Sequence, residues 1–477
     1  MTKISENFIQ HISQQGLAPD ELESFLSYCK KPLRRSFRVN SLHFETSSIT
    51  QDWQNQGYQL NSVPWAKDGY WIDEDHKALP AGLGNYIGHQ QGQIYIQEAS
   101  SMLPVTALFA ANPNPQKVLD MAAAPGSKTT QIAAMMDNKG LIIANELSSS
   151  RLKGLFSNVQ RCGVSNVCLT HADGRVFGDK TPEQFDAILL DAPCGGEGTV
   201  RKDPDALEAW SLDSVLAMSK IQRELICSAF KALKPGGTLV YSTCTLSQEE
   251  NQKVCQHLLE QFPEQVTVFN LENLFAGASK ATTKEGYLHI FPHIFDSEGF
   301  FVACFTKVMT EPLDKESVSK RKFPFAPISV KELTNFKSYC EHFGWNISDI
   351  ANSIWQRNNE IWYFPSGIQD LIGRIKMDRM GVKLAESHKK GYRLEHQAAI
   401  AFGDQFKTAQ FELNAQETCD FFLGRDIYPD ASLDNYQAEV LVTFNQQPIG
   451  LGKKVSNRIK NNLPRDLVRD GSFSSLN

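Results

Sequence analysis

The sequence lacks any segment that would place the protein in a membrane. No run approaches the roughly 18 apolar residues that a spanning helix requires, and residues 1–16 are polar where a signal peptide is apolar. We therefore expect a cytoplasmic protein with no membrane partner.

Paired metal ligands and paired disulfide cysteines are also absent. The ten cysteines contain no C-x-x-C pair, which argues against a zinc ribbon or a disulfide framework and leaves buried or catalytic thiols. His289 and His293 are four residues apart, but their stretch reads as a strand interrupted by Pro292. The sequence therefore predicts no metal site.

The chain has no excess of positive charge. Lys and Arg number 48 against 54 Asp and Glu, a net charge of −6, so any polyanion must meet local patches. Residues 30–38 hold five cations and no anion, which is typical of a solvated loop or a phosphate-contacting patch. Residues 371–393 have seven cations against two anions and residues 451–470 have six against two, either by chance or as part of an RNA-binding surface.

Length and patterning predict several domains. At roughly 150 residues per domain, 477 residues make about three. Beyond a charged, proline-bearing segment, Trp345, Trp355 and Trp362 offer enough aromatic material for a separate core. We expect an N-terminal α+β auxiliary domain that binds RNA, a central domain, a linker, an intermediate domain and a last domain, at 1–105, 106–310, 311–329, 330–389 and 390–477.

The central region predicts a doubly wound α/β sheet that is mostly parallel. Five short apolar runs are bounded by turn residues, as strands buried on both faces are, and amphipathic stretches such as 127–136 and 214–233 alternate with them. Two further apolar runs around 296–299 predict an antiparallel hairpin at the sheet edge. The five strand candidates are KVLDM, GLIIANE, NVCLTH, FDAILLDAP and GGTLVYSTC.

The loop after the first strand, DMAAAPGSKTT at 120–130, opens a helix whose free N–H groups can bind an anionic group. It is neither a Walker loop nor a G-x-G-x-x-G loop, which disfavours a nicotinamide cofactor. Asp120, Glu146 and Asp173 stand at the ends of three successive strands, where carboxylates can accept from ribose hydroxyls or an adenine amine. This pattern predicts a cofactor that contains a nucleoside.

Two cysteines occupy equivalent positions further along the sheet. Cys194 follows Asp191-Ala192-Pro193 after the fourth strand, and Cys244 follows Ser242-Thr243 after the fifth. A single cysteine is more often an inert buried side chain. Because neighbouring strands would bring both thiols to one cleft beside an aspartate, we favour a catalytic interpretation.

These motifs resemble those of the bacterial RNA (cytosine-5) methyltransferases of the Nop2/Sun family. The family uses S-adenosylmethionine on a Rossmann-like fold, and the resemblance spans residues 38 to about 305. It further suggests a PUA-like RNA-binding region at 390–477. One departure is Ser127, where the wider family has the second glycine of APGGKT. The matching stretches are RVNSL at 38–42, AAAPGSKT at 122–129, FDAILLDAPCGG at 185–196, STC at 242–244 and the EGFF hairpin.

The resemblance implies a role for each matching residue. Cys244 is the nucleophile, Cys194 assists product release, and Asp191 activates the base and also contacts the cofactor. Glu146 contacts the cofactor ribose and Asp173 the adenine. The loop that holds the methionine part of S-adenosylmethionine, and of its product S-adenosylhomocysteine, comprises Ala122, Ala123, Ala124, Pro125, Gly126, Ser127 and Lys128.

The residues themselves leave the two cysteines interchangeable. Carbon 5 of cytosine is a weak nucleophile, and addition of a thiolate to carbon 6 would activate it. Enzymes that methylate cytosine in DNA use the thiol of a Pro-Cys motif, so the choice of Cys244 rests on the resemblance to RNA enzymes.

The resemblance places the target at cytosine 1407 of 16S ribosomal RNA, and we expect the enzyme to act on the 30S subunit as a monomer. Another ribosomal or transfer RNA cytosine is one alternative. A ribosome assembly factor without catalysis is another, which the intact Asp191, Cys194 and Cys244 argue against.

Overall fold

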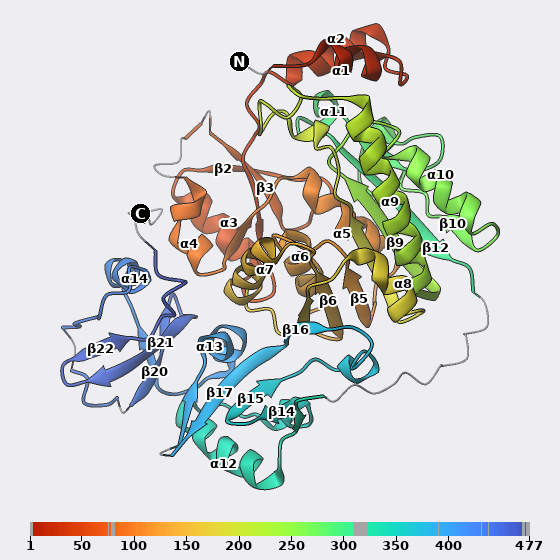
Figure 1. Cartoon of the computed structure of the whole chain (residues 1–477). Coiled ribbons are helices and arrows are strands. Elements are labelled where there is room, and N and C mark those ends of the chain that lie inside the picture. Colours follow the sequence, from red (N-terminus) through yellow and green to blue (C-terminus); the bar gives the residue numbers. More distant parts are fainter. Residues whose placement is uncertain are drawn as a thin grey trace.

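The computed structural model contains a large central sheet between two layers of helices (Figure 1). The N-terminal helices lie above this sheet in the view of Figure 1, and two smaller C-terminal sheets lie below it. The residues that the structure describes are 3–74, 76–77, 82–309, 323–389, 391–430, 432–436, 438–469 and 473.

The central sheet confirms the predicted α/β class. Its strands follow the order β10-β12-β9-β8-β5-β6-β7-β16, and β11 also pairs with β12. The strands β5 to β9 run parallel and coincide with the five apolar runs, while β12 and β16 join this set in the antiparallel sense. The bounds are β5 Lys117–Asp120, β6 Leu141–Asn145, β7 Val167–Thr170, β8 Phe185–Asp191, β9 Leu233–Thr243, β10 Val266–Val268, β11 Leu288–Ile290, β12 Phe300–Lys307 and β16 Met377–Met380.

Amphipathic helices cover both faces of this sheet. Each turns its apolar side chains onto the strands, so the parallel strands are buried from both sides. One face carries α5 (Leu103–Ala111), α6 (Ser127–Met135) and α7 (Ser149–Arg161). The other carries α8 (Phe177–Lys180), α9 (Leu212–Ala232) and α10 (Gln252–Gln261).

The predicted edge hairpin is present, with a longer connection than expected. β11 and β12 pair antiparallel, but the second half of the first apolar run forms the short helix α11 (Pro292–Phe295). Pro292 starts this helix because its fixed φ suits a first helical turn. His293 therefore lies on a helix and not in the strand that the sequence predicted.

The N-terminal region is α+β, as expected. The helices α1 and α2 precede a four-stranded antiparallel sheet of order β2-β3-β1-β4, and α3 packs on it. The bounds are α1 Glu6–Ser13, α2 Pro19–Tyr28, β1 Ser36–Val39, α3 Thr46–Asn55, β2 Gln59–Ser62, β3 Gly69–Asp73, α4 Ile87–Gln90 and β4 Ile94–Ile96.

The basic run at 30–38 is not simply a solvated loop or a phosphate patch. Its end forms β1, and Arg38 is only 3% exposed. The Arg38 guanidinium donates to Gln97 Oε1 (3.1 Å) and Thr130 Oγ1 (2.9 Å), so it joins the N-terminal sheet to α6. Arg34 lies over the ring of Trp71. These two cations have structural roles that composition does not reveal.

Two C-terminal sheets follow the central domain. The first has the order β13-β14-β15-β17-β18 and the second β19-β20-β21-β22. Their elements are β13 Ala326–Pro327, α12 Val330–Cys340, β14 Ile354–Arg357, β15 Glu360–Tyr363, β17 Val382–His388, β18 Gly391–Leu394, α13 His396–Phe402, β19 Gln410–Glu412, α14 Ala415–Phe422, β20 Glu439–Phe444, β21 Gln447–Val455 and β22 Arg458–Asn461.

These sheets do not follow the expected division of the chain. The boundary at 389/390 separates β17 from β18, although the two are paired, so we place the boundary after α13. β13 lies within the expected linker 311–329, of which residues 311–322 are outside the described part. β16, from the expected intermediate domain, pairs with β7 of the central sheet.

The three tryptophans do not form one separate core. Trp345 packs with Phe402 and Phe406 in the first C-terminal sheet. Trp355 and Trp362 instead belong to the apolar cluster under the central sheet. The C-terminal half is therefore joined to the central domain through a shared core as well as through β16.

Gly381 provides a test of this junction. It follows β16 at φ 63°, and a Cβ there would lie 2.1 Å from the Tyr363 carbonyl oxygen. Gly367 has a φ of 86° but only an ordinary contact for a Cβ. We expect Gly381→Ala to destabilise the protein by about 1–3 kcal/mol more than Gly367→Ala in thermal unfolding, because only the former adds overpacking to backbone strain. An equal loss of stability in the two variants would contradict tight packing between β16 and the residues around Tyr363.

Candidate active site

The residues predicted for the site come from the carboxyl ends of neighbouring parallel strands. β8 ends at Asp191 and leads to Cys194, and β9 ends at Thr243 and leads to Cys244. The two sulfur atoms are 3.1 Å apart and both thiols are free. The prediction that neighbouring strands bring the two thiols together is therefore confirmed.

Asp191 ends β8, three residues before Cys194, and lies in a polar cluster. Lys128 Nζ donates to Asp191 Oδ2 (2.7 Å), and Ser242 Oγ donates to Asp191 Oδ1 (2.7 Å). Lys128 also donates to Ser101 Oγ (2.8 Å) and lies near the ring of Phe300. The sequence grouped Lys128 with the cofactor loop, but here its ammonium points to Asp191 and the thiol side of the site.

The loop between β5 and α6 has the geometry of a ligand cradle. Gly126 caps α6 at φ 106°, and a Cβ there would lie 2.9 Å from Leu155. Ser127 starts the helix, so its difference from the family motif leaves the turn intact. Asp120 is buried below this loop, and burial raises its pKa to about 7. One oxygen accepts from Thr129 Oγ1 (2.6 Å), while the other has no partner among the described residues.

The two other predicted carboxylates, Glu146 and Asp173, differ in how closely a cation approaches them. Glu146 is buried and accepts from the backbone N–H of Ser148 (2.8 Å), with Arg151 3.7 Å away. Asp173 is held by the Arg175 guanidinium, which donates to both carboxylate oxygens and lowers the Asp173 pKa. Glu146, which follows β6, therefore has a cation only at 3.7 Å, whereas Asp173 is hydrogen-bonded directly to a cation.

The two thiols are not electrostatically equivalent. The hydrogen bond with Cys244, burial and the nearby charges of Cys244 and Glu250 all raise the pKa of Cys194 well above its ordinary value. A thiol whose proton is held this firmly can donate to a neighbouring thiolate but is a poor nucleophile. The raised pKa of Cys194 therefore favours Cys244 over Cys194 as the nucleophile.

A carboxylate that the sequence motifs do not reveal joins the two cysteine loops. Glu197, three residues after Cys194, is fully buried. It accepts five hydrogen bonds, from Thr245 Oγ1, the Leu246 and Ser247 N–H groups, Ser247 Oγ and Trp210 Nε1, at 2.5–2.9 Å. A glutamate in a Gly-rich loop looks like a surface residue in sequence, and only its partners reveal its role.

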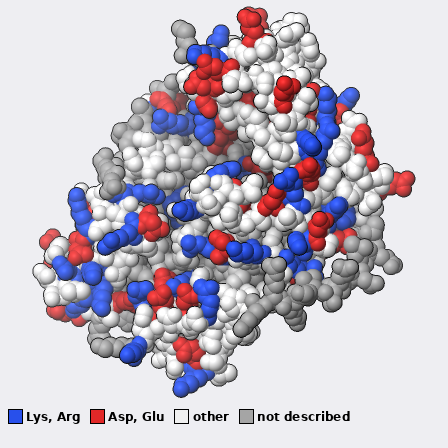
Figure 2. Space-filling model, viewed as in Figure 1, with Lys and Arg blue, Asp and Glu red and all other residues white. Residues whose placement is uncertain are grey.

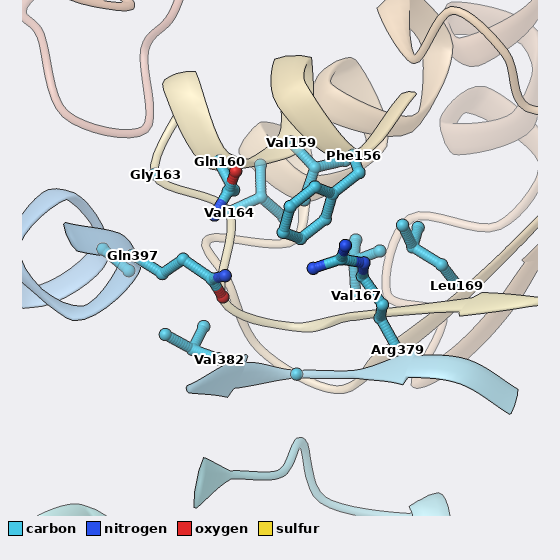
Figure 3. A pocket seen from close by; sticks show the side chains of 12 residues that line it. Phe156, Val159, Gln160, Gly163, Val164, Val167, Leu169, Arg379, Val382 and Gln397 are labelled. Atoms are coloured by element: carbon cyan, nitrogen blue, oxygen red, sulfur yellow. The ribbon is translucent and has the colours of Figure 1, made fainter. Parts of the chain in front are cut away.

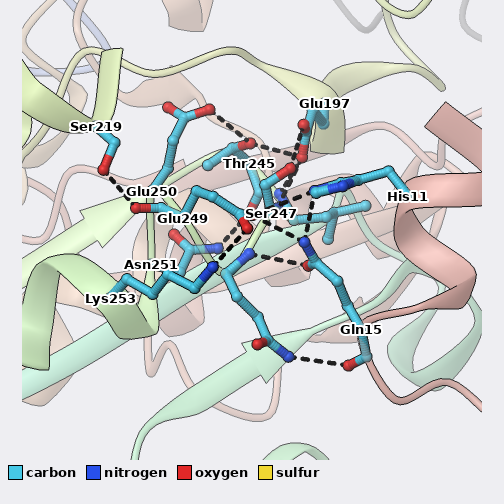
Figure 4. Close-up of polar contacts among 12 residues, drawn as sticks. His11, Gln15, Glu197, Ser219, Thr245, Ser247, Glu249, Glu250, Asn251 and Lys253 are labelled. Carbon is cyan, nitrogen blue, oxygen red and sulfur yellow. Dashed lines mark hydrogen bonds and ion pairs between the residues drawn. The ribbon is translucent and has the colours of Figure 1, made fainter. Parts of the chain in front are cut away.

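The N-terminal helix α1 supports the same segment from outside (Figure 4). His11 Nε2 and Gln15 Nε2 lie 3.2 and 2.9 Å from Glu249 Oε2. Gln15 also bonds to the backbone N–H of Gln248 (2.9 Å). The loop that holds Cys244 is therefore fixed between the sheet, the Cys194 loop and the N-terminal helix.

The C-terminal basic stretch at 371–393 is largely occupied by internal contacts. Arg379 lies over the Phe156 ring, 3.6 Å from its centroid, at a small cavity between α7 and β16 (Figure 3). Lys383 and Arg393 pair with Glu386. On the face shown in Figure 2, Lys and Arg are interspersed with Asp and Glu.

The basic side chains of the stretch at 451–470 form fewer internal ion pairs among the described residues. Lys453 and Lys454 lie on β21 and Lys460 on β22, where Lys453 and Lys460 are paired across the strands. None of the three forms an ion pair within the described part of the chain, whereas Arg458 pairs with Asp426.

Two classes of site are missing from the described residues. No cluster of three or more His, Cys, Asp or Glu side chains there could hold a metal ion. Within the same residues no helix is both long and apolar enough to cross a membrane.

Family models match nearly the whole chain. The model for the 16S rRNA methyltransferase RsmB/F matches residues 107–306, and the N-terminal domain of 16S rRNA methyltransferase RsmF matches 4–99. The pre-PUA domain of ribosomal RNA small subunit methyltransferase F matches 325–402, and the methyltransferase RsmF PUA domain matches 408–469.

Individual relatives agree with these models. Ribosomal RNA small subunit methyltransferase F from Citrobacter koseri and from Escherichia coli K12 are each 52% identical over 457 residues, which cover 95% of this chain and 94% of theirs. The motifs and the C-terminal extension of the sequence already resembled this enzyme.

Solved structures share the fold. A methyltransferase homolog protein from Pyrococcus horikoshii is 32% identical with a TM-score of 0.51, covering 64% of this chain and all of that one. The protein PH0851 is 31% identical with a TM-score of 0.56, covering 63% of this chain and 65% of that one. The chain belongs to the RsmB/F family of S-adenosylmethionine-dependent 16S ribosomal RNA methyltransferases, and it is an enzyme with a Rossmann-like core and an RNA-binding PUA domain.

Proposed function

We propose that the enzyme methylates carbon 5 of a cytosine in 16S ribosomal RNA, cytosine 1407, through a covalent cysteine adduct. The observation that carries this proposal is the pair of thiols 3.1 Å apart beside Asp191. A methyltransferase that modifies a ring nitrogen or a hydroxyl needs no thiol, whereas carbon 5 becomes nucleophilic only after a nucleophile adds to carbon 6.

The loop at 122–128 and the strand-end carboxylates fit the cofactor. Small residues and the α6 N-terminus suit the methionine part, and buried Glu146 suits the ribose hydroxyls. The unpartnered oxygen of Asp120 fits a cationic or donor group close to the loop. Asp173 would meet the adenine beside Arg175. When bound, S-adenosylmethionine supplies an electrophilic methyl group.

Cys244 acts as the nucleophile in this proposal. Its thiolate forms a bond to carbon 6, and the electron pair of the ring double bond moves to carbon 5, which then attacks the methyl group. Solvent water takes the carbon 5 proton, the electron pair of that C–H bond re-forms the ring double bond, and the sulfur–carbon bond breaks with its electron pair returning to Cys244. Cys194, which stays protonated, assists at this release step.

Asp191 and Lys128 stabilise the activated ring. Addition to carbon 6 pushes negative charge toward ring nitrogen 3 and the exocyclic oxygen. A proton shared between Asp191 and nitrogen 3, with the Lys128 ammonium 2.7 Å from Asp191, offsets that charge. Ser242 fixes the carboxylate from the side of β9.

The RNA must deliver an unstacked base to this cleft. Extrusion from a ribosomal helix costs a few kcal/mol, which contacts remote from the site must offset. The PUA domain, with Lys453, Lys454 and Lys460 on one hairpin, is the main candidate, and the N-terminal domain a second one. We propose that the enzyme acts on the 30S subunit in the cytoplasm as a monomer.

The target is tested by transfer of labelled methyl groups to unmodified 30S subunits, naked 16S RNA and bulk transfer RNA, followed by mapping of the modified base. We expect incorporation at cytosine 1407 in 30S subunits. Incorporation only into transfer RNA or at another ribosomal position would support the proposed reaction and contradict the proposed target nucleotide. No incorporation into any of the three would contradict the proposed reaction and favour a role in ribosome assembly.

Substitutions of the two cysteines test their roles. Cys244→Ala should abolish turnover because the remaining thiol, Cys194, keeps its proton and is a poor nucleophile. Cys194→Ala should accumulate a covalent protein–RNA adduct because release is slowed. Denaturing gel electrophoresis after incubation with RNA and cofactor measures both. An adduct formed by Cys244→Ala in place of Cys194→Ala would reverse the assignment.

Charge removal on the PUA hairpin tests the RNA-binding surface. Replacing Lys453, Lys454 and Lys460 by Ala should weaken RNA binding and lower the slope of log affinity against log salt by about 0.7–0.9 for each lost phosphate contact. Affinity for S-adenosylmethionine should stay the same. Arg458→Ala is the matched control, because Arg458 is already paired with Asp426. An unchanged salt slope in the triple variant would exclude this hairpin from the interface.

A further inference from the structure

The two thiols occupy similar positions, so their different roles must come from their surroundings. Each follows the carboxyl end of a parallel strand, each is partly exposed, and each has the other as its hydrogen-bond partner. The side chains beneath the Cys194 loop differ from those around Cys244, and the most prominent of them is Glu250.

Glu250 is fully buried against the Cys194 loop. Its Oε2 accepts from the Gly195 N–H (3.0 Å) and from Gln222 Nε2 (2.7 Å), and its Oε1 lies 3.4 Å from Thr245 Oγ1. Gln222 also donates to the carbonyl of Pro193 (2.9 Å). The carboxylate is therefore bonded to the residue after Cys194 and, through Gln222, to the residue before it.

Residue 195 must be small for the Glu250 carboxylate to reach the backbone of the Cys194 loop. A Cβ on Gly195 would lie 2.9 Å from Glu250 Oε1. The second glycine of the family motif DAPCGG, Gly196, has a φ of 73°, which favours glycine for a different reason. The loop is shaped so that the carboxylate of Glu250 reaches its backbone directly beside the thiol.

The charged and titratable groups around this carboxylate are few. They are Glu197 and Cys194, with Asp191, Cys244 and the Tyr241 hydroxyl in the next layer. No Lys, Arg or His side chain in the described part of the chain forms an ion pair with Glu250, and burial with the neighbouring Glu197 raises the pKa of Glu250 to about 7. The charge of Glu250 in turn contributes to the raised pKa of Cys194.

We propose that Glu250 is the positioning residue that makes the two thiols unequal: its buried carboxylate, bonded to Gly195 and through Gln222 to Pro193, keeps the proton on Cys194, so that Cys194 does not compete with Cys244 for carbon 6. This inference deepens the proposed function and rests on it for its consequence in catalysis. Its physical basis is that a fixed negative charge in a medium of low polarity opposes a second negative charge on the sulfur of the loop that it contacts.

The proton balance of the cycle follows from this arrangement. In this proposal the Cys194 S–H donates to the Cys244 sulfur before the base arrives. When Cys244 forms its bond to carbon 6, the S–H of Cys194 remains in place with its proton. When that bond breaks, the electron pair returns to the Cys244 sulfur, and the S–H of Cys194 again donates to the thiolate. Cys194 thus supports the departure of Cys244 without competing for carbon 6.

Glu249 offers a matched control. It is the adjacent residue, but its carboxylate faces outward to His11, Gln15 and Lys253 and not to the Cys194 loop. Replacing either glutamate by glutamine removes one negative charge and keeps an acceptor oxygen. Only the Glu250 change removes the charge beside Cys194.

The test measures the alkylation rate of each cysteine by iodoacetamide in the full-length protein without RNA, using peptide mass spectrometry. At pH 8.5, where Glu250 is ionised, we expect Glu250→Gln to raise the rate at Cys194 by about threefold to tenfold, since one pKa unit is tenfold in thiolate. The rate at Cys194 in Glu249→Gln should equal that of the parent. At pH 6, where Glu250 is protonated, the variant and the parent should converge.

Several outcomes would overturn the proposal. An unchanged Cys194 rate in Glu250→Gln, or an equal rise at both thiols with a lower melting temperature, would make Glu250 merely structural.

The parent protein gives a second test that needs no folded variant. In the parent protein, the increase of the Cys194 alkylation rate with pH should become less steep just above pH 7, where Glu250 becomes ionised. A constant slope through this range would exclude an effect of the Glu250 charge on Cys194. Because no RNA or methyl transfer is involved, these results are independent of whether the proposed methylation target is correct.

Discussion

The contact between the loops that follow β8 and β9 is the constraint on which the site depends. Each loop holds one cysteine, and Glu197 holds the two loops together with five hydrogen bonds to its buried carboxylate. A buried carboxylate is tolerated only when its acceptor positions are filled, so this glutamate can exist only with the loops closed. The thiol separation of 3.1 Å, and hence the chemistry, follows from that closure.

The RNA-binding half is part of the same rigid framework. β16 extends the central sheet at β7, Trp355 and Trp362 join the core beneath it, and Arg379 packs on Phe156 of α7. On the opposite side, α1 holds the segment after Cys244 through Glu249. The C-terminal half is therefore joined to the central sheet, and the N-terminal helix to the segment that follows Cys244.

The sequence predicted what local patterns determine. The strands β5 to β9 are short apolar runs because they are buried on both faces, and the cysteines could be placed from their positions after β8 and β9. It could not predict features that depend on distant partners. Met377–Met380 looks polar and becomes a strand only by pairing with β7, and Arg38 looks solvated but is buried by Gln97 and Thr130. Glu197 and Glu250 belong to this second class.

The central claim is that one thiol of the pair, Cys244, attacks the base while the other remains a thiol. The most direct measurement is the identity of the cysteine bonded to RNA that carries 5-fluorocytidine at the target, because fluorine at carbon 5 blocks the loss that release requires. Digestion and mass spectrometry of the trapped complex locate the bond. The account predicts the RNA on Cys244 with Cys194 unmodified. A bond to Cys194 would contradict it.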